Sequence, residues 1–441
     1  MTRLTACGIA LLALTAAALV YLLPWDKAEG LESLRTGMTA IVAASVGVYF
    51  LAVWLVLRQP QPRHAIWVVL IVAAAMRLPM LFAPPILSSD IYRYIWDGRV
   101  QAAWINPYLY VPVDPALAPL RDATIYPRIN RRDYAHTIYP PTAQAVFAAM
   151  GRISQTVFAE KLAMVAFEGL AIVCAIKLLA LMRLPTERVL IYAWNPLAVW
   201  SFAMDGHVDA VGIGLLAGAL LLLAKRRDGL AGIVFGAAAL VKFFPLAIGP
   251  ALWRQGGRWR FAGGTALAII ALYACYASAG SQVLGFLPGY GAEEALDNGE
   301  GIWFLAGLAK VFSLPAYALK LYGVVVLLIL GAMALWATTR PDSHDMRALC
   351  GRAAALAAVA TVVVGPHYHW YFAWLALPAI VAPSRAVIFL SAAPILLVIN
   401  PFDDAFFWAS LIYVPAIVLA LAERCPRLSP IEGTSPCPRR L

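Results

Sequence analysis

One stretch indicates the fold class by itself: residues 38–57 read MTAIVAASVGVYFLAVWLVL, a run without a charged side chain. An α-helix needs about 20 consecutive apolar residues to cross the hydrocarbon core of a bilayer. Working outward from this stretch, the chain holds about fourteen apolar runs of this kind, some of them shorter than a full span. They begin with residues 4–23 and end with residues 405–422. The pattern predicts a chain that crosses a membrane many times as helices.

The composition agrees with this interpretation. Of the 441 residues, 62% are hydrophobic and 13% are charged, and the mean hydropathy is +0.76. A soluble domain is about 45–50% apolar and about 25% charged, so this chain has too few charges to cover soluble domains. We therefore predict an all-α polytopic membrane protein with a bundle of roughly 12–14 transmembrane helices. An ordinary soluble enzyme, a disordered chain and a secreted disulfide scaffold are excluded.

The basic residues point to a membrane topology rather than to a nucleic-acid partner. The formal net charge is +10, but Lys and Arg lie in short clusters between the apolar runs. With the N-terminus inside, every short basic loop falls on the cytoplasmic side, as the positive-inside rule requires. Arg58, Arg183, Lys225 and Arg385 each mark one such loop.

This topology divides the chain into three parts. Residues 1–64 are predicted to form two N-terminal transmembrane helices, residues 65–422 the main transmembrane domain, and residues 423–441 a disordered cytoplasmic tail. The opposite face carries two long loops, at about residues 84–142 and about residues 280–315. Ordered loops longer than about 12–15 residues are usually functional, so we expect the functional site on that face.

The first long loop begins with a candidate catalytic acid, Asp90. Aromatic residues recur at helical spacing over residues 92–103 and predict an amphipathic helix in the membrane interface, with a second short helix at residues 142–153. A carboxylate at the rim of the membrane can serve as a general base. The alternative is a helix N-cap, a role that Ser88 and Ser89 can also fill. One residue can do both.

A second cluster of polar residues, Asp205-Gly206-His207-Val208-Asp209, falls at a turn between two apolar runs. Ionisable groups at this depth are costly unless they are satisfied or used. Histidine and carboxylates suit several divalent metal ions, and the same groups can bind a polar substrate. The third alternative is a capped turn with a purely structural role.

A lysine interrupts the apolar stretch of residues 229–253. Pro245 breaks the helix there, and the basic loops on both sides are predicted to be cytoplasmic, so the chain must enter the membrane and return with Lys242 near the turn. A buried ammonium group needs an anionic partner, and a lipid phosphate is one candidate. Snorkelling or an internal ion pair is the alternative.

Further cations and aromatic residues fall on the same face. His367, His369 and Trp370 suit a wall that contacts sugar or phosphate, although an interfacial aromatic belt has the same composition. Arg128 and Arg131 of the first loop are candidates for phosphate binding or for contact with lipid headgroups. Because the strongest candidates share one membrane face, we favour a functional interpretation over a structural one.

These residues, taken in order, resemble the GT-C glycosyltransferases, which use a polyprenyl-phosphate sugar as donor. The likeness is greatest to the mannosyltransferases that include the GPI first-mannose enzyme and bacterial polyprenol-phosphomannose-dependent homologues. It rests on Asp90-Ile91-Tyr92 through Asp97, Asn106-Pro107-Tyr108, Tyr139-Pro140-Pro141, Asn195-Pro196, Gly206-His207-Val208-Asp209, Lys242-Phe243-Phe244-Pro245 and His367-Tyr368-His369-Trp370-Tyr371. The chain departs from the eukaryotic enzyme in having Ser88-Ser89-Asp90 where that enzyme has Asp-x-Asp, and in two extra membrane runs before Asp90.

The resemblance implies an inverting hexosyl transfer, with mannose favoured, to a glycolipid or glycan acceptor. We assign Asp90 as the base that takes the proton of the acceptor hydroxyl. Binding of the leaving phosphate is assigned to Lys242, His367, Arg128 and Arg131. Binding of sugar or acceptor is assigned to Asp97, Tyr139, Asp205, His207, Asp209, His369 and Trp370.

The resemblance also implies a GT-C-like bundle in the bacterial inner membrane, with its active site facing the periplasm. A phosphate leaves readily, so no cofactor is required; a divalent metal is compatible with the chemistry but not indicated. The expected partners are the polyprenyl-phosphate sugar, the acceptor and membrane lipid. The competing class is a secondary transporter or lipid flippase. Transporters usually contain internal repeats and ionisable groups near the membrane midplane, whereas this sequence shows no repeat and its acids lie mainly at one rim.

Overall fold

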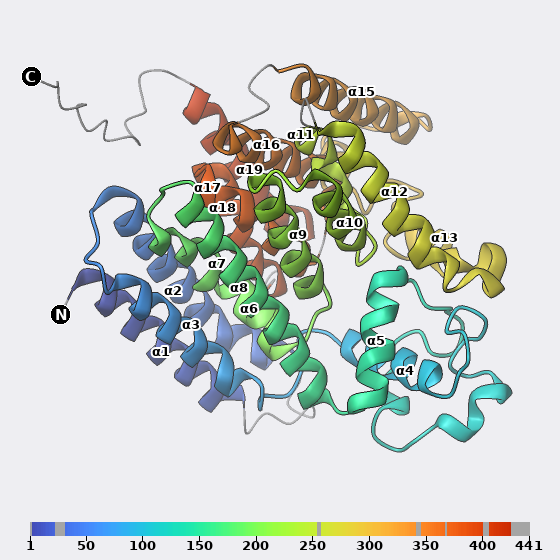
Figure 1. Ribbon diagram of the computed structural model, residues 1–441. Helices are drawn as coiled ribbons and strands as arrows, with labels where there is room; N and C mark the ends of the chain where they lie inside the picture. Colours follow the sequence, from blue (N-terminus) through green and yellow to red (C-terminus); the bar gives the residue numbers. More distant parts are fainter. Residues whose placement is uncertain are drawn as a thin grey trace, which may run out of the picture.

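The computed structural model describes residues 2–22, 31–253, 257–340, 345–366, 368–399 and 405–424. Helices make up the regular structure of these residues, which contain no strand (Figure 1). The N-terminal half consists of α1 (Arg3–Leu22), α2 (Leu31–Arg58), α3 (Ala65–Met80), α4 (Asp90–Ala102), α5 (Pro141–Ile153), α6 (Val157–Leu181), α7 (Leu190–Ala193), α8 (Pro196–Ala198) and α9 (Asp209–Ala224). The C-terminal half consists of α10 (Asp228–Ala239), α11 (Gly249–Leu252), α12 (Arg258–Ala274), α13 (Leu287–Glu293), α14 (Trp303–Ala309), α15 (Ala318–Thr339), α16 (Met346–Val364), α17 (Ala376–Val381), α18 (Arg385–Ala392) and α19 (Ala405–Arg424). Short 3-10 or π segments join several of them, including η5 (Val199–Met204), η6 (Phe244–Ile248), η7 (Ala277–Leu284) and η8 (His369–Leu375).

Several of these helices are long and apolar enough to cross a bilayer. Within the described residues there are six: Arg3–Leu22, Met38–Arg58, Val157–Leu181, Ala318–Thr339, Met346–Val364 and Phe406–Glu423. The bent pair Arg258–Ala274 and Ala277–Glu293 makes seven if it counts as one span. Shorter apolar helices lie at Ala65–Met80, Asp209–Ala224, Asp228–Ala239, His369–Val381 and Arg385–Leu397. The chain is therefore a multi-pass helical membrane protein, with fewer full-length spans than the predicted 12–14.

Enclosed, broken segments account for part of this difference. Residues 189–204 form one apolar run in the sequence, but the structure breaks them at Asn195-Pro196 into α7, α8 and η5, with every residue buried. The Asn195 side chain accepts from the Leu197 N–H (3.0 Å) and donates to the Ser391 carbonyl (2.8 Å), so the break is satisfied by hydrogen bonds. A segment enclosed by protein needs neither the length of a span nor an unbroken helix.

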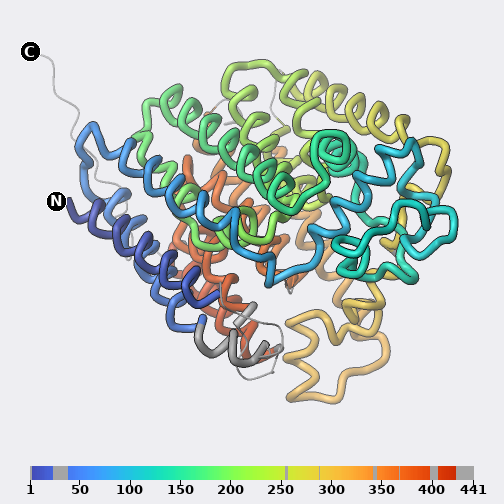
Figure 2. The backbone as a smooth tube through the Cα atoms, turned by 90° about the horizontal axis from the view of Figure 1, so that it is seen from below, coloured from blue at the N-terminus to red at the C-terminus, as the bar shows by residue number. Residues whose placement is uncertain are grey.

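The first long loop contains both predicted short helices, α4 and α5. Residues 91–98 of α4 are all buried, so this helix is packed within the protein rather than lying in the membrane interface as we expected. Gly98 of α4 lies against the α5 backbone, and Gly151 of α5 lies against Gly98, so a side chain at either position would meet main-chain atoms. In the tube view the loop curls back on itself beside the bundle (Figure 2). Its buried side chains, among them Ile91, Tyr94 and Trp96, belong to the same hydrophobic core as the bundle.

The second long loop contains η7, α13 and α14. Its contacts with the first loop include a hydrogen bond from the Asn106 amide to the Ser278 hydroxyl (2.9 Å) and an ion pair between Arg131 and Glu293. Figure 1 shows α13 on the same side of the bundle as α4 and α5. The two long loops therefore form one surface.

A buried ion pair joins α3 to α6 inside the bundle. The guanidinium group of Arg77 lies 2.7 Å from Glu168 and also donates to the Ala193 carbonyl at 2.7 Å. Tyr192 donates its hydroxyl to Glu168 (3.3 Å). At the C-terminal end, Glu423 and Arg424 still belong to α19, and the rest of the predicted tail, residues 425–441, lies outside the described residues.

Candidate active site

The turn between η5 and α9 holds the start of the first loop. The carboxylate of Asp205 accepts from the backbone N–H groups of Ile86 (3.0 Å) and Leu87 (3.2 Å). Gly206 has a φ of +71°, and the space that a side chain would need is filled by Ile91 of α4. Glycine is required here because other residues rarely adopt this conformation. The turn and the beginning of α4 are thereby held together.

Asp90 is the first residue of α4 and lies over this turn. One carboxylate oxygen, Oδ1, accepts from the amide of Asn130 at 2.7 Å, and the other, Oδ2, lies 3.9 Å from Nδ1 of His207. Its backbone N–H donates to the Ser88 hydroxyl (3.2 Å). The side chain is 18% exposed, so a ligand can reach it.

His207 is fully buried beneath Asp90. Its ring stacks on Trp370, with ring centroids 3.8 Å apart, and its Nδ1 lies 3.4 Å from the Tyr94 hydroxyl. Burial lowers the pKa of His207 well below its usual value, and the neighbouring Lys242 and His369 lower this pKa further. The imidazole is therefore neutral at physiological pH and can both donate and accept a hydrogen bond.

Lys242 lies in the break after α10, as the sequence predicts, and its ammonium group is 2.6 Å from the carboxylate of Asp209. The same ammonium group lies 4.6 Å from the ring centre of Tyr371. The Asp209 side chain is only 1% exposed, whereas that of Lys242 is 14% exposed. Of the alternatives for this lysine, the structure contains the internal ion pair, and the Lys242 side chain remains partly exposed.

Several buried polar atoms at this site have no hydrogen-bond partner among the described residues. They are Oδ2 of Asp205, Nε2 of His207, Oδ1 of Asp209, Nε2 of His369 and Nε1 of Trp370. Buried polar groups in proteins are nearly always hydrogen-bonded, so such atoms are suited to a polar ligand or to ordered water. Among the described residues, no three His, Cys, Asp or Glu side chains are grouped to hold a metal ion.

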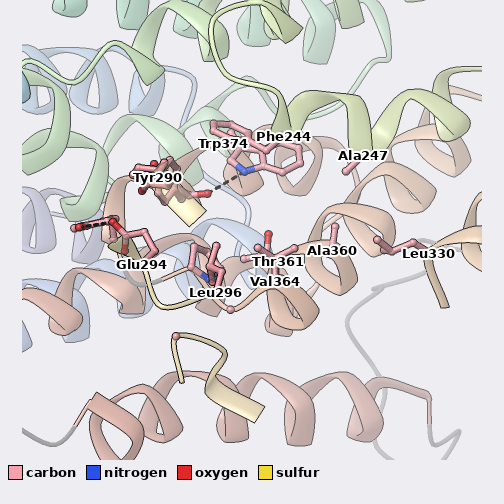
Figure 3. A pocket seen from close by; sticks show the side chains of 15 residues that line it. Phe244, Ala247, Tyr290, Glu294, Leu296, Leu330, Ala360, Thr361, Val364 and Trp374 are labelled. Carbon is pink, nitrogen blue, oxygen red and sulfur yellow. Dashed lines mark hydrogen bonds between the residues drawn. The ribbon is translucent and has the colours of Figure 1, made fainter. Parts of the chain in front are cut away.

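An apolar cavity of about 360 Å³ adjoins the polar cluster. In Figure 3, Tyr290 and Glu294 lie at one end of it, and Ala247, Ala360 and Leu330 lie at the other. Tyr371, which lines the cavity, also contacts Lys242. The cavity and Lys242 therefore share Tyr371 as a neighbour.

Two predicted site residues have structural contacts instead. Asp97 is buried in an ion pair with Arg93 (2.9 Å) and accepts from the Gln144 amide (2.8 Å). Tyr139 packs edge-on against Tyr94, with ring centroids 5.0 Å apart. The Asp97 carboxylate is therefore engaged by Arg93 and Gln144.

Three further predicted residues, Trp370, His369 and His367, come from the same stretch of sequence. Trp370 is stacked between His207 and Tyr368, so its ring faces are covered rather than open to a sugar. His369 is buried, with its ring centre 6.5 Å from that of His207. His367 lies outside the described residues.

The two arginines of the first loop already have partners. Arg128 is exposed and donates to the Tyr92 hydroxyl (3.3 Å). Arg131 pairs with Glu293 and lies 3.8 Å from Glu294. A phosphate would have to compete with these acidic residues for Arg131.

Sequence reasoning missed Asn130, Tyr94 and Tyr371 as members of the site, and missed Glu293 as the partner of Arg131. Asn130 lies between the two arginines that we singled out, but no spacing rule connects an irregular loop to Asp90. Tyr94 lies four residues after Asp90, on the same face of a helix, and this spacing could have identified it. Glu293 belongs to the other long loop, so only the fold reveals its contact.

Comparison with known proteins gives one match. The family described as "Alpha-(1->6)-mannopyranosyltransferase, N-terminal domain" matches residues 3–254, which is more than half of the chain. No curated protein and no solved structure gives a significant match. The matched region contains Asp90, the 205–209 turn and Lys242. The chain therefore belongs to this mannopyranosyltransferase family, and its function is mannosyl transfer.

Proposed function

We propose that this protein transfers mannose, with inversion, from a polyprenyl-phosphate donor to a periplasmic glycolipid or glycan acceptor. Family membership supports mannosyl transfer over the transporter alternative. The observation that carries the donor class is the apolar cavity whose lining residue Tyr371 contacts Lys242, the partner of Asp209. An amphiphilic donor with an apolar chain and a phosphate needs this combination of surfaces.

The lipid chain of the donor would occupy the cavity beside α15 and α16. Leu330 of α15 lines the cavity, and the most apolar part of α15 is 0% buried within the protein. A prenyl chain longer than the cavity can therefore continue past α15 into the bilayer. Its phosphate would lie near Lys242, which contacts the cavity-lining residue Tyr371.

Asp90 is the best candidate for the base among the three aspartates of the cluster. Asp209 is ion-paired and almost fully buried, and Asp205 is 1% exposed and holds the backbone of Ile86 and Leu87. Asp90 is 18% exposed, and its Oδ2 lies 3.9 Å from Nδ1 of His207. A general base must be able to reach the hydroxyl whose proton it accepts.

In the proposed reaction, Oδ2 of Asp90 takes the proton of the acceptor hydroxyl while the acceptor oxygen attacks the anomeric carbon of mannose. The bond between this carbon and the phosphate oxygen breaks, and its electron pair stays on the phosphate. Lys242 stabilises the charge on this leaving group. An α-linked product formed with inversion requires a β-linked donor, and no step is assigned to a metal ion.

The mannose ring would be held by the buried atoms without partners, which a sugar reaches only when the site opens. The free oxygens of Asp205 and Asp209 can accept from sugar hydroxyls, and the ring nitrogens of His207 and His369 can bind others. A site that hydrogen-bonds hydroxyl groups discriminates strongly against analogues that lack them. We therefore expect deoxy-mannose donors to be poor substrates.

We place the protein in the bacterial inner membrane with this site facing the periplasm, because the short basic loops fall on the other face. Asp133 of the first loop is well exposed, with 66% of its side chain accessible. In a Cys275→Ser background, which removes an exposed native thiol, a cysteine at position 133 should react with a membrane-impermeant maleimide from outside the cell. Labelling only after the membrane is permeabilised would refute this orientation.

The function is tested with purified protein in liposomes. We expect transfer of label to an acceptor mannolipid or glycan from radiolabelled polyprenyl-phosphate mannose, but not from GDP-mannose or polyprenyl-phosphate glucose. Transfer from GDP-mannose alone would overturn the donor class while leaving mannosyl transfer intact. Donor translocation without any glycosidic product would instead support the transporter alternative.

A further inference from the structure

A second cavity, of about 240 Å³, lies between α2, α18 and α19. Its walls include Trp54 and Leu57 of α2, Phe389 of α18 and Leu419 of α19. Arg58 and Arg385 complete it. It shares no lining residue with the cavity beside Lys242, so it is a separate feature of the protein.

Two arginines form the polar part of this cavity. Arg58 is the last residue of α2 and Arg385 the first of α18. Glu423 of α19 lies 3.7 Å from the Arg385 guanidinium group and also accepts from the Ser384 hydroxyl (2.8 Å). The Nε atom of Arg385 is buried without a hydrogen bond to the described residues.

The apolar part of the cavity lies at the edge of the membrane. Arg58 ends the span Met38–Arg58, and Trp54, one helical turn earlier, has 49% of its surface exposed. Tryptophan followed by a basic residue at the end of a span is typical of the level of the lipid headgroups. The cavity therefore presents apolar walls on the acyl-chain side and cations on the headgroup side.

We propose that this cavity binds an anionic glycerophospholipid of the leaflet that faces the short basic loops. Its headgroup phosphate would contact Arg58 and Arg385, and an acyl chain would lie along Trp54, Leu57 and Leu419. Basic pockets between transmembrane helices on the cytoplasmic side are suited to anionic headgroups. A free phosphate ion would leave the apolar walls unused, and a zwitterionic lipid would gain less from the cations. The lipid would link α2 to the C-terminal helices.

The test is native mass spectrometry of the full-length protein, purified in detergent and titrated with dioleoylphosphatidylglycerol or dioleoylphosphatidylcholine. We expect tighter retention of phosphatidylglycerol. The double variant Arg58→Gln/Arg385→Gln should weaken this retention about 25-fold, since each basic residue near an anionic lipid contributes about a fivefold factor. The double variant Lys225→Gln/Arg227→Gln, which removes the same charge from an exposed loop, should bind as the unaltered protein does.

Two further measurements distinguish binding of a lipid from binding of a free phosphate ion, and they do not depend on the arginine variant being folded. Leu419→Trp fills the apolar part but keeps both arginines, and it should also weaken lipid retention if the acyl chain lies there. Inorganic phosphate should not compete at concentrations far above those of the lipid. Equal retention of phosphatidylglycerol by the unaltered protein and by both cavity variants would overturn the proposal, as would equal binding of the two lipids. Displacement by inorganic phosphate would show an ion site rather than a lipid site.

Discussion

Replacing Asp90 with asparagine separates the catalytic role of this carboxylate from its structural role. The amide keeps the size of the side chain, and its oxygen can still accept from Asn130, as Oδ1 does now at 2.7 Å. It cannot take a proton from an acceptor hydroxyl. Loss of a general base typically lowers the rate about 10²–10⁴-fold, which corresponds to about 3–5 kcal/mol of activation free energy.

The structural cost of this replacement is much smaller. Asp90 is in the first turn of α4, where a negative charge stabilises a helix by about 0.3–1 kcal/mol. The side chain is 18% exposed and makes no buried ion pair with Arg or Lys. We therefore expect Asp90→Asn to retain its fold and its donor binding while its turnover falls at least a hundredfold.

The assay is single-turnover transfer of mannose from the polyprenyl-phosphate donor, together with thermal unfolding in detergent. The matched control is Asp133→Asn in the same loop, where an exposed aspartate lies 3.4 Å from Arg132 and little change is expected. Asp97→Asn is unsuitable as a control, although its position in α4 suggests it. It would leave the buried Arg93 without its carboxylate, at a cost of about 3–5 kcal/mol.

One result would refute the reasoning. If folded Asp90→Asn protein turns over at nearly the unaltered rate, Asp90 is not the base. The proton would then have to go to Asp205 or Asp209. Since both are almost fully buried, this outcome would also mean that the site opens before reaction.

Three other changes test separate contacts of the structure. Asn130→Ala removes the donor that positions the Asp90 carboxylate; single-turnover transfer should slow because the base is less well oriented, while thermal unfolding stays unchanged. Lys242→Gln removes the cation beside the leaving phosphate and should lower kcat about 10²-fold or more, measured by single-turnover transfer; an unchanged rate would exclude a role in the reaction. Arg77→Met leaves Glu168 buried without its partner, and should destabilise the protein by about 3–5 kcal/mol in thermal unfolding, whereas the double variant Arg77→Met/Glu168→Leu should recover most of this loss.

The fold class could be predicted from the sequence because membrane-spanning helices are recognised by their apolar composition and by the length of their apolar runs. The number of spans could not. Residues 189–204 have the composition of a membrane segment, yet they form three short helical pieces enclosed by other helices. An apolar run enclosed by protein and one that faces lipid can have the same composition and the same length, so neither property distinguishes them.

The position of α4 shows a related ambiguity. Its aromatic residues recur at helical spacing, which predicts one apolar face. That face can lie on a membrane or on another helix. In the structure, Gly98 lies against the backbone of α5, so this face of α4 packs on another helix. The sequence alone does not show which element packs against a glycine.

The members of the site were easier to predict than their roles. Asp90, Asp205 and Asp209 are chemically identical in the sequence, and only their partners distinguish them: the Asn130 amide, two backbone N–H groups and Lys242, respectively. For Asp97 the sequence did contain a warning. Arg93 precedes it by four residues, the spacing of an ion pair within a helix, and this is the pair that the structure contains.

Lys242 and Arg131, the two cations of the site, form different kinds of ion pair. Under the proposed mechanism this difference gives them different roles. The side chains of Arg131 and Glu293 are 25% and 26% exposed, and ion pairs in partial contact with water contribute only about 0–1 kcal/mol. Arg131 can therefore leave Glu293 for a phosphate at little cost. Lys242 cannot leave Asp209 so easily, because the Asp209 side chain is 1% exposed and breaking a buried pair costs about 3–5 kcal/mol. Lys242 must bind the phosphate while it keeps Asp209, which fixes where the phosphate lies. Arg131, released from the second loop, would then add charge only when the donor has arrived.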